Sequence, residues 1–419
     1  MKEHDFGTVR KLAWTEICPW LCLFQTFRLA VGPRLLVLSA AALFAIATGW
    51  SILEVILPVG EPTSEAERCP WLAITALVPD RPSLSPGMGT LSSEPSRENV
   101  PETTRPSTLM WLRLATPFRP GAQSEGVIGG LRTVLGFLWT LVVWAFLGGA
   151  ITRTAAVQLA AEERIGWSAM LDFARAKWGS YVAAPLFPLG GVLLAVVPIA
   201  VLGLIMRLDF GVLVAAVFWP LALLGGLVMA ILLLGLLFGW PLMWATISTE
   251  GTDSFDALSR SYAYVFQRPL HYLFYAVVAL GFGLLGWLLV SNFAAAVIQL
   301  TYWAAGWGCG REQLGNVLTG SEALGMMGGA GATLIRFWVG CVKLLAAGFL
   351  YSYFWTASVA IYLLLRRDVD ATEMDEVFQE EETEEPAYGL PTVSTDETGA
   401  PTIEESTTAS NSTNPNHEE

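Results

Sequence analysis

The fold class that the sequence predicts is all-α: a polytopic helical membrane protein with about six transmembrane helices. The 419 residues are 53% hydrophobic and only 15% charged, a composition outside the range of soluble globular proteins. Six apolar stretches each reach about 20 residues, which at about 1.5 Å per residue crosses a hydrocarbon core of about 30 Å. Arg, Lys, Asp and Glu stand mostly at the ends of these stretches. A lipid bilayer is therefore the expected environment.

The predicted spans divide the chain into the following elements. An amphipathic N-terminal segment (1–34) precedes spans 35–57, 127–151, 182–206, 221–247, 272–296 and 342–365. A loop at 58–126, a turn with a short apolar segment at 207–220 and a Gly-rich segment at 297–341 separate them. The sequence ends in a tail at 366–419. The Ser-, Pro- and Thr-rich stretch at 79–106 and the acidic tail are expected to be disordered.

The distribution of Lys and Arg predicts the orientation. Short cytoplasmic flanks carry an excess of these residues, and the N-terminal segment carries Arg28 and Arg34 besides three further basic residues. This rule places both termini in the cytoplasm and the 58–126 loop outside. The net charge of −13 comes from the tail, which holds 16 acidic residues from Asp368 to Glu419. The rest of the chain is nearly neutral, so no nucleic-acid partner is expected.

Three apolar stretches overshoot their spans on the predicted outer side. They are 211–220, 297–307 and 325–337. Pro220 is a candidate helix break, because proline lacks the backbone N–H and disfavours helix at the preceding residue. Short interfacial or re-entrant helices would explain these stretches. Over-long, tilted spans would explain them equally well.

The sequence contains a parallel internal repeat. Its first copy comprises spans two and three (127–206), and its second copy comprises spans four and five (221–296). Each copy places a short amphipathic helix between two spans. In the first helix the apolar side chains that recur at helical spacing include Trp167, Met170 and Trp178; in the second they include Phe255, Leu258, Tyr262 and Phe266. Asp253 and Asp256 resemble a weakened capping box for the second helix. The stretch from Thr356 to Arg367 looks like the start of a third copy that does not return.

The aromatic residues beside Arg and Lys suit helices that lie in the headgroup layer. On this interpretation the residues named above face lipid, and Arg268 and His271 lie at the cytoplasmic interface. The alternative is that both stripes pack against neighbouring spans, and the two interpretations are compatible.

This plan resembles families of bacterial polytopic proteins built from span, amphipathic helix and span. One is the membrane domain attached to some glycerophosphodiester phosphodiesterases, and the similarity rests on residues such as Asp256-Ala257-Leu258-Ser259-Arg260-Ser261-Tyr262. The stretch from Cys18 to Arg34 is similar to the start of a family of uncharacterised bacterial membrane proteins. The resemblance implies a location in the bacterial cytoplasmic (inner) membrane, and it implies no activity, because the phosphodiesterase part is missing.

The sequence offers little that suggests catalysis or a cofactor. The chain has only three His residues, so no metal site is expected, and neither catalytic residues nor a cofactor are predicted. Cys69 and Cys309 both fall on the predicted outer side, where a disulfide between them would persist. The leading hypothesis is a non-enzymatic structural component that organises lipids or membrane-protein partners. The alternative is a transporter or channel for an apolar or zwitterionic small molecule, which a cavity lined by Ser, Thr, Asn and Gln would favour.

Overall fold

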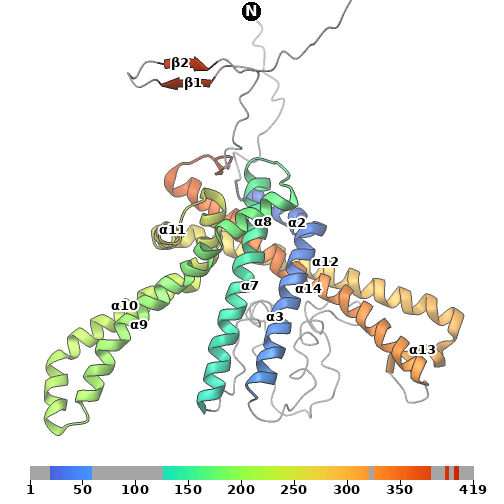
Figure 1. Cartoon of the computed structure of the whole chain (residues 1–419), viewed down its shortest axis with the longest axis horizontal. Coiled ribbons are helices and arrows are strands. Elements are labelled where there is room, and N and C mark those ends of the chain that lie inside the picture. Colours follow the sequence, from blue (N-terminus) through green and yellow to red (C-terminus); the bar gives the residue numbers. More distant parts are fainter. Residues whose placement is uncertain (1–18, 59–125, 320–324, 379–391, 396–400, 405–419) are drawn as a thin grey trace, which may run out of the picture. The chain divides into compact units, whose positions relative to one another are not determined.

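The computed structural model describes residues 19–58, 126–319, 325–378, 392–395 and 401–404 (Figure 1). The chain forms two units, Met1–Val377 and Phe378–Glu419. All secondary structure in the described part of the first unit is helical. Six of its helices are long and apolar enough to cross a membrane. The predicted all-α, multi-pass membrane class is therefore confirmed.

The long helices are α3 (Pro33–Ile56), α7 (Gly126–Ala160), α9 (Trp178–Ile205), α10 (Asp209–Glu250), α12 (Pro269–Cys309) and α14 (Met326–Asp370). The short ones are the 3-10 helix η1 (Pro19–Leu21), α2 (Cys22–Ala30), α8 (Trp167–Ala176), α11 (Ser254–Gln267) and α13 (Arg311–Thr319). Helices α8 and α11 are the two predicted amphipathic helices, and each lies between two long helices, as the repeat requires.

The over-long spans are continuous helices, and the predicted break at Pro220 is wrong. Helix α10 runs through Pro220 for 42 residues, which makes it about 63 Å long. Proline is tolerated inside membrane helices where neighbouring groups satisfy the freed carbonyl. The predicted segment at 207–220 reduces to a tight turn before Asp209. A Cβ on Gly211 would lie 1.8 Å from the Ile205 carbonyl oxygen, so this turn requires glycine.

The predicted Gly-rich connection at 297–341 is also mostly helical. Helix α12 continues to Cys309, and α14 already begins at Met326. Between α12 and α13 the chain reverses at Gly310, whose φ of +81° favours glycine. Each glycine destabilises a helix by only about 0.5–1 kcal/mol. The packing and apolar surroundings of a membrane helix outweigh this cost.

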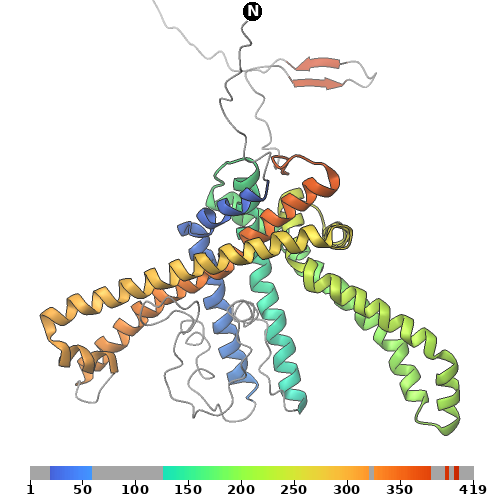
Figure 2. The same ribbon diagram turned by 180° about the vertical axis from the view of Figure 1, so that it is seen from behind.

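Three antiparallel helix pairs extend from one packed region of the first unit (Figures 1 and 2). The pairs are α3 with α7, α9 with α10, and α12 with α14, and we call them the arms. We call the packed region the hub: it comprises α2, α8 and α11 with residues 140–159 of α7, 235–249 of α10 and 346–365 of α14. In α9 and α10 only 6% of the most apolar stretch is buried, against 56% in α7. The arms thus leave apolar side chains for contact with lipid.

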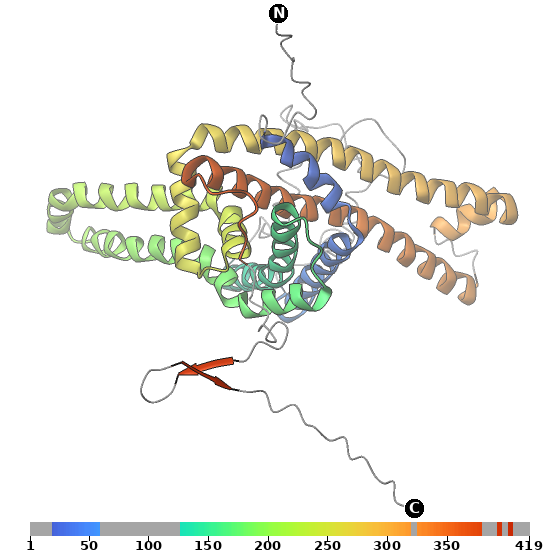
Figure 3. The same ribbon diagram turned by 90° about the horizontal axis from the view of Figure 1, so that it is seen from above.

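The hub has a cyclic, three-fold plan. Helices α7, α10 and α14 run towards it and pack against one another, whereas α3, α9 and α12 run away from it. Each short helix packs against the end of one incoming helix: α8 on α7, α11 on α10 and α2 on α14. Figure 3 shows the short helices around the centre. The third copy, predicted not to return, is therefore completed by the N-terminal helices α2 and α3.

The end of α14 and the tail differ from the predicted tail at 366–419. Helix α14 continues to Asp370, and residues 371–378 fold back as a turn, in which Arg366 Nη1 donates to the Glu376 carbonyl oxygen at 2.6 Å. In the second unit β1 (Thr392–Thr395) and β2 (Pro401–Glu404) pair antiparallel, with Val393 opposite Ile403. The Thr, Val and Ile residues of these strands favour extended structure. The disorder predicted for the tail stays a prediction.

Candidate functional site

One tryptophan from each incoming helix meets the others at the centre of the hub. Trp144 of α7, Trp244 of α10 and Trp355 of α14 are each at most 1% exposed. The Trp244 and Trp355 rings stack with their centroids 4.4 Å apart, and the Trp144 centroid lies 5.9 Å from that of Trp355. Gly148 permits this approach, because a Cβ there would lie 2.9–3.3 Å from all three side chains. We call these three residues the tryptophan junction.

The three indole N–H groups of the junction differ in their hydrogen bonding. Trp244 Nε1 donates to the Tyr181 carbonyl oxygen of α9 at 2.9 Å. Trp144 Nε1 and Trp355 Nε1 are buried and have no acceptor within the described structure. A buried donor without a partner costs about 1–3 kcal/mol. The junction therefore retains two buried donors whose loss of hydration is not compensated by a hydrogen bond.

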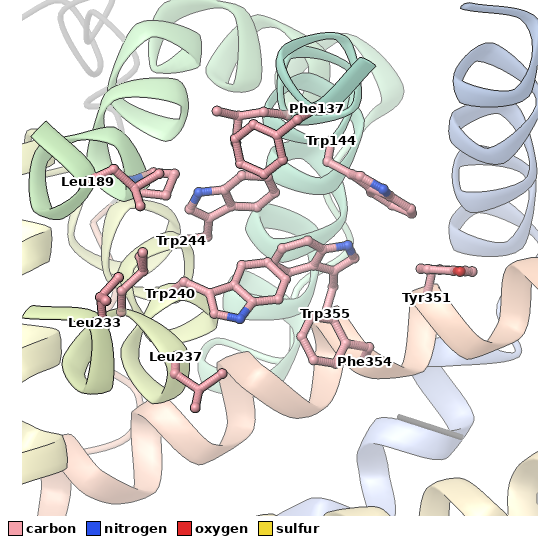
Figure 4. A pocket seen from close by; sticks show the side chains of 13 residues that line it. Phe137, Trp144, Leu189, Leu233, Leu237, Trp240, Trp244, Tyr351, Phe354 and Trp355 are labelled. Carbon is pink, nitrogen blue, oxygen red and sulfur yellow. The ribbon is translucent and has the colours of Figure 1, made fainter. Parts of the chain in front are cut away.

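An apolar pocket of about 550 Å³ adjoins the junction (Figure 4). Its lining residues come from α7, α9, α10 and α14: Phe137, Leu141, Trp144, Pro185, Leu189, Leu233, Leu236, Leu237, Trp240, Trp244, Tyr351, Phe354 and Trp355. The volume falls in the range of about 300–1,000 Å³ that is usual for ligand pockets. Leu233 and Leu237 are 44% and 52% exposed, so the pocket opens along the lipid-facing arm of α10.

A second, smaller apolar cavity lies on the other side of the α10–α14 contact. Its volume is about 130 Å³, and it shares Leu237 and Phe354 with the larger pocket. The Tyr272 hydroxyl at its edge donates to the Phe238 carbonyl oxygen at 2.9 Å. The contact between α10 and α14 is thus flanked on both sides by apolar space.

Buried polar residues join the incoming helices on the hub side of the junction. The Tyr181 and Ser248 hydroxyls are 2.7 Å apart, and the Ser248 hydroxyl donates to Thr152 Oγ1 at 2.6 Å. Arg153, only 6% exposed, donates to the Ser248 carbonyl oxygen at 2.9 Å and lies 4.2 Å from the Phe173 ring centroid. The cluster ties α7, α8, α9 and α10 together.

Glu250 at the end of α10 is the centre of a second polar cluster. Its carboxylate accepts from Arg260 at 2.9 Å and from the Tyr362 hydroxyl at 2.5 Å, and Arg366 Nε lies 3.4 Å away. Burial alone would lower the pKa of the Arg260 guanidinium, but the facing Glu250 carboxylate raises that pKa above its ordinary value. The Tyr264 hydroxyl donates to Asp370. The cluster joins α10, α11 and α14, and the sequence alone did not indicate it.

Of the residues predicted to face lipid from the first amphipathic helix, only some are exposed. Trp167 is 43% exposed, whereas Met170 is 2% exposed and packs in the core. The lipid-facing assignment of Met170 is therefore wrong, because α8 turns this residue towards α7. Trp178 does not belong to α8, which ends at Ala176; it begins α9, is 42% exposed and donates from Nε1 to the Val142 carbonyl oxygen.

The second amphipathic helix, α11, forms where it was predicted and has three faces. The Asp253 side chain caps it by accepting from the backbone N–H groups of Phe255 and Asp256. At about 100° per residue the faces are roughly 120° apart. The buried face carries Ala257, Ser261, Tyr264 and Val265; the water-facing side carries Asp256, Arg260 and Gln267; the third carries Phe255, Leu258, Tyr262 and Phe266.

The third face is the predicted lipid-facing stripe. Phe255 and Phe266 are exposed, whereas Leu258 and Tyr262 are half-buried. The Tyr262 hydroxyl donates to the Leu232 carbonyl oxygen at 2.6 Å. Arg268 and His271 are exposed where α12 begins. Contact of these residues with lipid stays a prediction.

The cysteines and the metal prediction are tested only within the described residues. Cys309 is an exposed free thiol at the end of α12, and its predicted partner Cys69 lies outside the described residues, so the disulfide stays a prediction. Burial raises the pKa of the Cys22 thiol in α2 to about 11. Among the described residues, no three His, Cys, Asp or Glu side chains are grouped closely enough to hold a metal ion.

Comparison with known protein families, characterised proteins and solved structures finds no match for this chain. The candidate site therefore depends on its geometry. The sequence analysis missed the pocket and the junction, because Trp144, Trp244 and Trp355 lie about a hundred residues apart in uniformly apolar segments. The sequence did contain one indication of the junction, because each of the three tryptophans lies in the second half of an incoming span. Within its described residues, this helical membrane protein has six helices able to span a bilayer and an apolar pocket that opens beside exposed leucines of α10.

Proposed function

We propose that this protein is a non-enzymatic membrane component that binds lipid in the apolar pocket beside the tryptophan junction and organises the surrounding bilayer. The observation that carries the proposal is the pocket itself: about 550 Å³, walled by Leu, Phe, Pro, Tyr and Trp side chains, and open along an arm that exposes leucines. In a bilayer the molecule available at such an opening is a phospholipid.

The chemistry of the pocket suits an acyl chain. The apolar walls match the hydrocarbon, and aromatic rings such as Trp240 and Phe354 offer large contact areas. The two N–H donors of Trp144 and Trp355 lack acceptors, and Figure 4 shows both nitrogens on the side of the rings nearer Tyr351. The pocket therefore offers apolar surface to a bound lipid rather than hydrogen-bond donors.

The transporter alternative has weaker support. A path for a zwitterionic substrate would need polar side chains along a cavity through the membrane. The two apolar cavities described above, on either side of the α10–α14 contact, are lined almost entirely by apolar atoms. The polar residues of the described hub are engaged with one another or with backbone oxygens. A structural or lipid-binding role therefore fits these residues better.

The test is to fill the pocket without disturbing the hub. Leu233→Trp adds a large side chain at the mouth of the pocket. Leu223→Trp makes the same change in the same helix at a residue that is 65% exposed and does not line the pocket. We expect the full chain carrying Leu233→Trp to retain at least one phospholipid fewer per protein in native mass spectrometry after detergent extraction.

The control variant and the wild type should retain equal numbers. Size-exclusion chromatography of both variants checks that the fold is intact. Equal retention of phospholipid by all three folded proteins would refute lipid binding in this pocket.

A further inference from the structure

A second cavity, of about 560 Å³, lies at the hub between the start of α3 and the end of α7. Unlike the apolar pocket, it has polar side chains at seven of its eleven lining residues, which are Gln25, Arg28, Arg34, Thr154, Gln158, Glu162 and Arg164. We call it the basic groove. It shares no residue with the apolar pocket beside the tryptophan junction.

Three segments each contribute one arginine to the basic groove. Arg28 belongs to α2, Arg34 to the first turn of α3, and Arg164 to the connection between α7 and α8. Glu162 contributes one negative charge, so the groove keeps a positive excess. Guanidinium groups from separate segments that converge on one cavity form a site for an anion.

Arg34 is held in place by its neighbours. Its Nη1 donates to the Ile165 carbonyl oxygen at 2.9 Å, and its guanidinium carbon lies 5.8 Å from the centre of the Trp167 ring. This hydrogen bond uses one of the five N–H donors of the guanidinium. The first N–H groups of α3, which have no partner inside their own helix, add partial positive charge at the same place.

We propose that the basic groove binds the phosphate of an anionic phospholipid headgroup. The groove adjoins α3, which is one of the six helices able to span the membrane. The apolar Leu29 and Leu35 also line it, and Val37 of α3 is 49% exposed. A lipid that places its phosphate between the arginines would lay its glycerol and acyl chains along this apolar surface. A free phosphate ion would use only the charged part.

This proposal goes beyond lipid binding in the apolar pocket. The two proposals concern different residues, so the failure of one would leave the other intact. The test compares Arg28→Gln/Arg164→Gln with Arg175→Gln/Arg207→Gln, which removes the same charge from exposed positions outside the groove. The former leaves the bond between Arg34 and Ile165 intact. Binding of phosphatidylglycerol and of phosphatidylcholine to the detergent-solubilised full chain is titrated by native mass spectrometry.

We expect the wild type to prefer phosphatidylglycerol, and the groove variant to lose about tenfold or more in affinity for that lipid. The control variant should change by about twofold at most, since its surface charges are screened. Leu233→Trp should keep the preference, because it alters only the apolar pocket. Equal losses in the two double variants would overturn the proposal, because they would mean unspecific surface attraction.

Inorganic phosphate and glycerol 3-phosphate distinguish the source of the phosphate group. We expect millimolar concentrations of either to leave the binding of phosphatidylglycerol nearly unchanged, because neither can use the apolar surface beside the groove. Displacement of the lipid by inorganic phosphate at these concentrations would show a site for free phosphate and overturn the lipid assignment.

Discussion

At the scale of single residues, the packing at the centre of the hub depends on aromatic side chains and on the glycine between them. Large aromatic rings dominate the energetics of a core, and stacked pairs add about 0.5–1.5 kcal/mol beyond the burial of their area. Trp244 and Trp355 stack at 4.4 Å, and Gly148 leaves the space that the tryptophan junction needs. The same rings form a wall of the apolar pocket.

Gly148→Ala should therefore destabilise the protein. A Cβ at this position would lie 2.9 Å from Trp244 and 3.2 Å from Trp355, and rigid rings in a packed core cannot move aside cheaply. We expect a loss of about 1–3 kcal/mol, seen as a lower midpoint in thermal unfolding followed by tryptophan fluorescence. In Gly190→Ala nothing lies within 4 Å of the new Cβ. That control should be neutral or slightly stabilising, and a Gly148→Ala midpoint equal to it would contradict the packing described here.

At the scale of elements, α11 shows how one short helix serves three environments. Its buried face packs in the hub, its charged face carries Arg260 towards Glu250, and its third face presents Phe255 and Phe266. Gly235 of α10 makes room for Tyr262 of this helix, because a Cβ there would lie 2.1 Å from the Tyr262 ring, and Gly239 faces Ser261. These small residues therefore serve contacts within the chain. An amphipathic helix with a second apolar face is expected where protein, lipid and water meet.

Phe255→Asp tests whether the third face of α11 contacts lipid. Phe255 is 65% exposed, so the loss of protein contacts is small and the cost arises mainly where the new charge meets lipid. In nanodiscs we expect a destabilisation of about 1–2 kcal/mol, by analogy with charged substitutions on lipid-facing surfaces. The measurement is unfolding by denaturant in nanodiscs.

Gln267→Glu introduces the same charge in the same helix at an exposed position of the water-facing side, and it should be nearly silent. If the two variants unfold alike, Phe255 faces water and α11 does not lie in the headgroup layer.

At the scale of the whole first unit, the cyclic plan of the hub explains how the two ends of the membrane region meet. Ser352 of α14 donates from its hydroxyl to the Ala30 carbonyl oxygen of α2 at 2.9 Å, across 322 positions of sequence. Gly348 allows α14 to approach the backbone of α3 near Ala40. The first and last helices therefore close the ring that the two complete repeats begin.

This plan makes the membrane topology testable with single cysteines. In a background whose five native cysteines are replaced by serine, we expect Ser93→Cys and Arg207→Cys to react with an impermeant maleimide added outside intact cells. Thr395→Cys should react only after the membrane is opened, because the positive-inside rule places the tail in the cytoplasm. Labelling of Ser93→Cys and Thr395→Cys from the same side would show that the orientation predicted from Lys and Arg is wrong.

Much of the fold could be predicted from the sequence, since hydrophobicity and helical periodicity are local properties. The six spans and the short helix that begins after Asp253 followed from apolar length, apolar spacing and a capping residue. The candidate site could not be predicted in this way. Where every position of a segment is apolar, as around Trp144 and Trp244, the pattern does not distinguish the face that meets protein from the face that meets lipid.

The sequence by itself determined the membrane class, the number of spans and the amphipathic helices, because the cost of burying polar groups in lipid acts on each segment separately. Only the tertiary structure decided that α10 passes through Pro220, that Met170 is buried, and that α2 and α3 complete the third repeat. These outcomes depend on packing between segments far apart in the chain. The tryptophan junction, the apolar pocket and the basic groove arise at those contacts, and a single segment carries no information about them.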